Sequence, residues 1–66
     1  MKIMVNGKSF ETGQETSLAQ VIESLGGLRE GMAVARNMEV VPRQELQSVV
    51  VQEGDSLEII QAVGGG

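Results

Sequence analysis

A single segment of the sequence has the apolar spacing of an amphipathic helix, and it lies early in the chain. Four aliphatic residues fall at positions i, i+3, i+4 and i+7, which places them on one helix face; they are Leu18, Val21, Ile22 and Leu25. Thr16 or Ser17 can cap the first turn, Gln20 follows Ser17 as in a capping box, and Gly26-Gly27 supplies a left-handed stop. We therefore predict a helix over residues 17–25 whose four aliphatic side chains belong to the core.

The residues before this helix have the pattern of a β-hairpin. Met1, Ile3 and Val5 alternate with positions that point the other way, which is the period-two pattern of a half-buried strand. Asn6-Gly7 is a strong signal for a tight turn between two strands. The first dozen residues therefore predict two antiparallel strands.

The remainder of the chain holds short apolar segments separated by turn residues. Residues 32–36 and 57–61 predict two more strands, and residues 40–41 are a short apolar pair closed by a proline, which cannot donate to a strand ladder. Residues 44–47 predict an irregular turn, and residues 49–51 are three valines with strong β propensity. The order is two strands, a helix, a strand and then short β elements.

This order predicts an α+β fold in which a mixed sheet packs on one main helix, because the apolar face of the helix needs an apolar surface to cover it. We expect one domain over residues 1–63 and a flexible tail over residues 64–66. The sheet residues expected to point toward the helix are Ile3, Val5, Val34, Leu57 and Ile59.

The residue types that are missing exclude several kinds of site. Without cysteine there is no disulfide, thiolate zinc site or thiol nucleophile, and without histidine the commonest general base and metal ligand is absent. The carboxylates are dispersed and lack the dense spacing of a calcium loop, so we interpret them as solvated charges. They include Glu11, Glu15, Glu53, Asp55 and Glu58. The sequence thus predicts no catalytic residue, no metal site and no bound cofactor.

The formal net charge of −4 argues against a nucleic-acid partner, because phosphate contacts need clustered basic residues and the five here are scattered. At the N-terminus, the apolar run Ile3-Met4-Val5 is far too short for a signal peptide or a membrane span. We therefore expect a soluble, cytoplasmic protein with no membrane partner.

The chain ends in Gly64-Gly65-Gly66, and this end together with the order of elements resembles a known family. The sequence is similar to the sulfur carrier proteins of thiamine thiazole biosynthesis, which have the ubiquitin-like β-grasp fold with the last strand beside the first. Arg36 does not match, since the family often has an aliphatic residue at that position. Besides the terminal glycines, the segments that match are Asn6-Gly7, Ala35, Asn37, Val41-Pro42-Arg43, Gly54-Asp55, Glu58-Ile59 and Ala62-Val63.

The resemblance implies a carrier and not an enzyme. In such a family an adenylyltransferase related to ubiquitin-activating enzymes uses ATP to adenylate the terminal carboxylate, here that of Gly66. Sulfur from the persulfide of a donor protein then replaces AMP, and a thiazole synthase receives sulfur from the resulting thiocarboxylate. Gly64 and Gly65 form the narrow arm that enters the clefts of these partners, because glycine has no Cβ.

A docking surface for the activating enzyme is expected near this tail. If Leu57 and Ile59 point inward, the period of two places Glu58 and Ile60 on the outer face of the last strand. By the same alternation Met4 lies on that outer face, beside Ile60 if the first and last strands pair. Exposed apolar residues commonly mark interfaces, so we predict that Ile60, Met4 and Glu58 contact the partner.

Three other functions fit parts of the sequence. A subunit like the small subunit of molybdopterin synthase also ends in diglycine but is generally longer, so length favours the thiazole pathway. A ubiquitin-like modifier would join the same carboxylate to lysines of other proteins and leave isopeptide conjugates. A β-grasp domain that only mediates interactions would not depend on Gly65 and Gly66.

Overall fold

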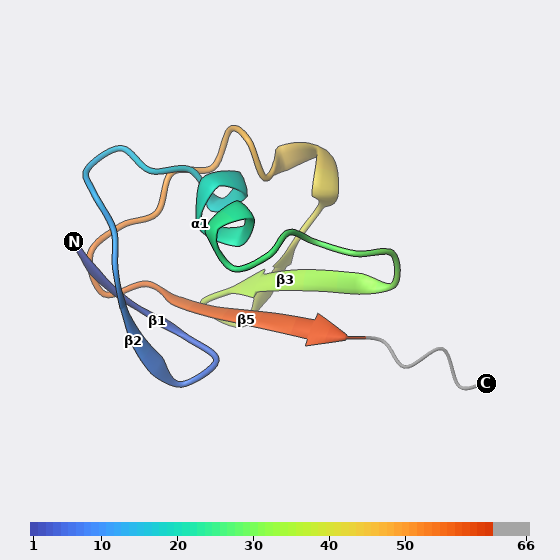
Figure 1. Cartoon of the computed structure of the whole chain (residues 1–66), viewed down its shortest axis with the longest axis horizontal. Coiled ribbons are helices and arrows are strands. Elements are labelled where there is room, and N and C mark those ends of the chain that lie inside the picture. Colours follow the sequence, from blue (N-terminus) through green and yellow to red (C-terminus); the bar gives the residue numbers. More distant parts are fainter. Residues whose placement is uncertain (62–66) are drawn as a thin grey trace.

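The computed structural model describes residues 1–61, and within them five strands and one α-helix follow the predicted order (Figure 1). A short 3₁₀ helix, η1, occupies part of the segment where an irregular turn is predicted. The elements are β1 Lys2–Val5, β2 Lys8–Glu11, α1 Leu18–Ser24, β3 Met32–Arg36, β4 Glu39–Val41, η1 Arg43–Glu45 and β5 Ser56–Gln61.

Local sequence signals set the turns and the helix ends as predicted. Asn6 and Gly7 both have positive φ, 50° and 81°, the geometry of the tight turn that joins β1 to β2. Ser17 caps α1: its hydroxyl accepts from the Gln20 backbone N–H, and the Gln20 side chain accepts from the Ser17 N–H at 2.9 Å. The predicted capping box is therefore confirmed.

The strands form one mixed sheet in the order β2-β1-β5-β3-β4, and α1 covers one of its faces (Figure 1). β1 and β5 are parallel, whereas the other neighbouring pairs are antiparallel. The last strand thus lies beside the first, which confirms the arrangement expected of a ubiquitin-like β-grasp fold.

The core lies between α1 and the sheet, and most of the predicted inward residues are in it. Ile59 is only partly buried but packs against it. Leu46 and Val51, which the sequence did not single out, complete the core from the segment between η1 and β5. The buried cluster contains Ile3, Val5, Leu18, Val21, Ile22, Val34, Leu46, Val51 and Leu57.

The prediction for Leu25 is wrong, because this side chain is 43% exposed. α1 ends at Ser24, and Leu25 is its C-cap with non-helical ψ, so the fourth position of the apolar face falls where the helix has already stopped. At about 1.5 Å per residue a seven-residue helix is also shorter than the sheet that it covers. One end of the inner sheet face therefore extends past the helix.

Residues 49–51 do not join the sheet despite their β propensity. Val50 makes an isolated antiparallel bridge with Ser17. On either side of it, the Leu18 N–H donates to the Val49 carbonyl and the Val51 N–H to the Thr16 carbonyl, both at 2.9 Å. This segment thus closes the start of α1 and directs Val51 into the core.

The interpretation of Asp55 as a solvated charge is wrong, because this residue is buried, with 6% exposure. Its Oδ2 accepts from Arg36 Nε at 2.8 Å and from the Gln52 backbone N–H at 2.7 Å, and its Oδ1 accepts from Asn37 Nδ2 at 3.1 Å. Burial alone would raise the pKa of Asp55, but these donors and the charge of Arg36 outweigh it and hold the pKa below its ordinary value. Asp55 is therefore ionised near neutral pH.

We expect Asp55→Asn to lower the free energy of unfolding by about 1–3 kcal/mol near neutral pH, because the donors around it lose a charged acceptor. A group whose pKa is lowered by folding contributes stability that is present above its ordinary pKa, 3.8, and is lost as the pH falls through the folded value. The difference between the two proteins should therefore shrink in acid. Urea unfolding of both at about pH 7 and about pH 3 measures this, and an equal difference at both would contradict it.

Candidate functional site

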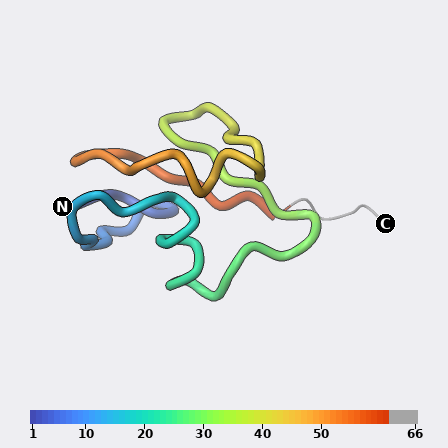
Figure 2. Tube along the Cα trace, turned by 90° about the horizontal axis from the view of Figure 1, so that it is seen from above, coloured from blue at the N-terminus to red at the C-terminus, as the bar shows by residue number. Residues whose placement is uncertain are grey.

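The candidate site is the end of β5 and the surfaces around it. β5 continues to Gln61, which pairs with Met32 at the start of β3. The loop between α1 and β3 reaches the same end of the molecule in both orientations (Figures 1 and 2). Gly64, Gly65 and Gly66, and the predicted domain boundary after Val63, lie outside the described residues. The last described residue, Gln61, thus lies at this end of the sheet.

Glu58 and Ile60 lie on the outer face of β5, as predicted. The alternation is visible in burial: Leu57 is 2% exposed, whereas Ile60 is 42% exposed. On β3, Ala33 is opposite Ile60 and Ala35 is opposite Glu58, so the neighbouring outer positions carry only methyl groups. Ile60 therefore stands above its neighbours on this face.

The prediction that Met4 lies beside Ile60 is wrong. Met4 is on the outer face, but the parallel register places it opposite Ser56. Ile60 is four residues further along β5, about 13 Å away at the usual rise of a strand. β1 ends at Val5 and pairs with β5 only as far as Leu57. No residue of β1 therefore lies beside Ile60.

A further exposed aliphatic side chain on this face comes from β4, and sequence reasoning missed it. Val40 is 65% exposed and lies opposite Ala35, one strand further from β5. We call Ile60, Ala33, Ala35 and Val40 the outer patch, in which Ala35 is itself only 5% exposed. The alternation within residues 39–41 could have indicated that Val40 points outward, but only the pairing of β3 with both β4 and β5 places it on the same face as Ile60, level with Glu58 across β3.

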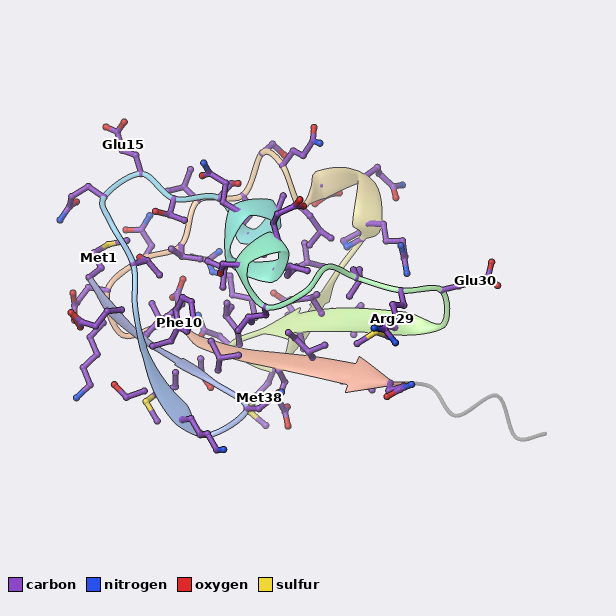
Figure 3. The ribbon with its side chains drawn as sticks, in the orientation of Figure 1. Met1, Phe10, Glu15, Arg29, Glu30 and Met38 are labelled. Atoms are coloured by element: carbon purple, nitrogen blue, oxygen red, sulfur yellow. The ribbon has the colours of Figure 1, made fainter. Side chains whose placement is uncertain are left out.

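Met38 is a second exposed apolar residue that the sequence did not single out. It is 95% exposed and lies on the side of the sheet away from α1 (Figure 3). Its φ is 72° and that of Asn37 is 51°, so the β3–β4 turn uses a left-handed conformation that favours glycine at the position of Met38. The Asn37 side chain fixes this turn by accepting from the Ser56 N–H at 2.9 Å.

Arg43, to which the sequence gave no role, supports the loop at the tail end of the molecule. Its guanidinium donates to the backbone carbonyls of Arg29 and Met32, the latter at 3.3 Å. Arg29 and the neighbouring Glu30 lie at this end, next to the end of β5 (Figure 3). Arg43, which lies in η1, thus holds the start of β3 in place. Because Met32 pairs with Gln61, this contact also supports the end of β5.

Two further features are absent from residues 1–61. No group of three or more acidic side chains there is arranged to hold a metal ion. In the same part of the chain, no helix is long and apolar enough to cross a membrane.

Comparison with known proteins gives a consistent match over the whole chain. The model of the ThiS family matches residues 3–66. The chain is 29% identical over 66 residues to the sulfur carrier protein ThiS of Escherichia coli strain K12, and the match covers 100% of both. The crystal structure of the thiamine biosynthesis protein ThiS from Geobacter metallireducens has a TM-score of 0.84 and 30% identity, again with 100% of both chains covered.

A longer relative contains the same stretch. The chain is 35% identical over 66 residues to the thiazole synthase of Paramagnetospirillum magneticum, and these residues amount to 20% of that protein. The chain thus spans about a fifth of the length of this relative, which has further chain around or beside the matching region.

Because Ile59 and Ile60 point to opposite faces of the sheet, the same substitution should lower the free energy of unfolding by different amounts at the two positions. Ile60→Asp should lower the free energy of unfolding by about 1 kcal/mol, from lost β propensity and neighbour packing. Ile59→Asp should cost about 2–4 kcal/mol, because its side chain packs against the core. Urea unfolding of the two variants measures both values. A larger cost for Ile60→Asp would mean that the register of β5 is wrong by one residue.

Proposed function

The chain belongs to the ThiS family, and on this basis we propose that it is a sulfur carrier in thiamine biosynthesis, acting as a co-substrate of other enzymes and not as a catalyst. The observation that carries the proposal is the match of residues 3–66 to the family model. It is supported by the end-to-end match to the E. coli sulfur carrier protein. The ending Gly64-Gly65-Gly66 gives the chain a narrow terminus for the chemistry.

In the proposed reaction the carboxylate of Gly66 attacks the α-phosphorus of ATP, which is bound by the partner, and pyrophosphate leaves. This step is needed because a carboxylate is a poor electrophile, whereas the carbonyl carbon of an acyl adenylate can be attacked. A persulfide sulfur of the donor protein then displaces AMP, and a thiol cleaves the resulting disulfide to leave a thiocarboxylate. The carrier supplies reach and recognition, and the partner supplies catalysis and ATP, which also fits a cytoplasmic location.

We assign the outer patch, together with Glu58, to the ubiquitin-activating-like adenylyltransferase. Ile60 lies only six residues before Gly66, so an enzyme that takes the tail also approaches this side chain. Val40 extends the apolar surface across β3 at 65% exposure. Met4, about 13 Å from Ile60 along the strand direction, would lie at the rim of such a contact. The acceptor of the sulfur is proposed to be a thiazole synthase, the activity named for the longer relative.

The terminus gives the sharpest test of the proposal. Incubated with the adenylyltransferase, ATP and the sulfur donor, the protein should gain the mass difference between sulfur and oxygen, located at Gly66 by fragmentation. A variant with one alanine added after Gly66 should show neither this gain nor ATP–pyrophosphate exchange, because the Gly66 carbonyl is then part of a peptide bond and is no longer a carboxylate. Its unfolding midpoint serves as the control, since the core lies within residues 1–61. Normal exchange by the extended protein would exclude the carrier function.

Docking through the outer patch predicts a second result. Ile60→Asp should weaken binding of the adenylyltransferase by about 2–4 kcal/mol, or about thirty- to a thousandfold, because a carboxylate is buried without a partner and an aliphatic contact is lost. Val50→Asp is the matched control: Val50 is 40% exposed, close to the 42% of Ile60, but lies beside the start of α1. Calorimetry of the three proteins measures the affinities. Equal losses in both variants would place the docking surface elsewhere.

A further inference from the structure

The inner face of the sheet has an apolar hollow at the tail end of the molecule. Its volume is about 500 Å³; Val5, Phe10, Leu25, Met32 and Ile59 form its apolar lining, and Asn6, Lys8 and Ser9 from the β1–β2 hairpin complete it. The hollow exists because α1 ends at Ser24, whereas β5 runs on beneath it to Gln61. Phe10 forms one wall on the side of the sheet that α1 covers (Figure 3). Among the apolar residues that line the hollow, Leu25 is the most exposed, at 43%, and it belongs to none of the contact surfaces described above.

The edge of β5 beside this hollow is open in the part of the chain that the structure describes. β1 pairs with β5 only at Met4 and Val5, whereas β3 pairs with β5 as far as Gln61. Beyond Val5, the Asn6 side chain replaces a strand, since its Oδ1 accepts from the Ile59 N–H at 2.8 Å. The Ile59 carbonyl and the Gln61 N–H point to the same side, because N–H and C=O of alternate residues share a direction in a strand. An extended segment could add there.

We infer that the hollow and this open edge together bind an extended segment of the thiazole synthase, with an apolar side chain of that segment in the hollow. The inference rests on the proposed function and names the surface that the acceptor enzyme uses. Five residues follow Gln61, and a fully extended chain of that length spans at most about 17 Å. An enzyme that holds the C-terminal carboxylate must therefore cover the surfaces that border Gln61. These surfaces are the outer patch and the hollow, on opposite faces of the sheet.

The hollow, and not the outer patch, suits the synthase because of the kind of contact that each surface offers. In the P. magneticum protein a stretch similar to this whole chain is part of the synthase polypeptide, so the two parts remain together. Long-lived interfaces are more apolar than transient ones. The hollow is concave and five of its eight lining residues are apolar, with Asn6, Lys8 and Ser9 as the others, whereas the outer patch presents the protruding Ile60 with Glu58 beside it. A carrier held through the hollow also leaves the outer patch free for activation.

The test uses the full-length carrier and the thiazole synthase of the same organism. Leu25→Asp should weaken synthase binding by at least about tenfold, because it places a carboxylate in the apolar hollow. Its rate of ATP–pyrophosphate exchange should stay within about twofold of wild type, since Leu25 lies on the face opposite the outer patch. Val50→Asp, with 40% exposure at the other end of α1, should leave both measurements unchanged.

A measurement on the unaltered carrier makes the test independent of any folding defect. In the complex, hydrogen exchange of the Gln61 amide should slow by at least about tenfold, because the edge of β5 becomes paired. Wild-type synthase affinity of Leu25→Asp, or exchange at Gln61 that does not slow, would overturn the inference. Self-association of the free carrier through the hollow, or slow exchange already in the free protein, would do the same. Thiocarboxylate formation by wild type, measured in parallel, shows whether the proposed function holds in each of these cases.

Discussion

The position of β5 between β1 and β3 is the constraint on which the rest of the structure depends. Without it, residues 1–11 and 32–41 would be two separate hairpins, because only β5 joins them into one sheet. Each residue of β3 is paired with a residue of β5, while β1 contributes two parallel pairs on the other side. β5 is therefore a central strand of the sheet. Its direction fixes where Gln61 lies and which surfaces border it.

The buried carboxylate of Asp55 lies directly before this strand and positions its start. It binds Arg36 and Asn37 at the end of β3 and the Gln52 backbone in its own loop. A buried ion pair is weak support for stability in itself, since removing two charges from water offsets much of their attraction. Here the donors come from two parts of the chain, the end of β3 and the loop that precedes β5. Their common acceptor thus fixes the register of β5 against β3, which in turn determines that Ile60 faces outward.

The features that the sequence predicted are those determined by near neighbours. The Ser17–Gln20 capping box, the Asn6-Gly7 turn and the alternation of Ile59 and Ile60 all depend on residues within four positions. The misjudged features depend on contacts between distant segments. Met4 was placed beside Ile60 because alternation gives the face but not the register, and Leu25 was assigned to the core because periodicity does not show how far the sheet extends beyond a helix. The same limit applies to Asp55, whose partners include residues 18 and 19 positions away.

The alternation at the end of β5 also explains how glycines can suffice as a tail. Adjacent residues Ile59 and Ile60 point to opposite faces, so two different surfaces border the point where the tail begins. Both lie within the reach of five residues from the terminal carboxylate, so under the proposed function either enzyme can recognise the domain while the tail enters its cleft. Specificity then comes from contacts on the folded sheet and requires no side chain near the reacting carbon. Under the proposed function the terminal glycines, which have no Cβ, can fit two clefts of different shape, because the two faces of one strand already distinguish the partners.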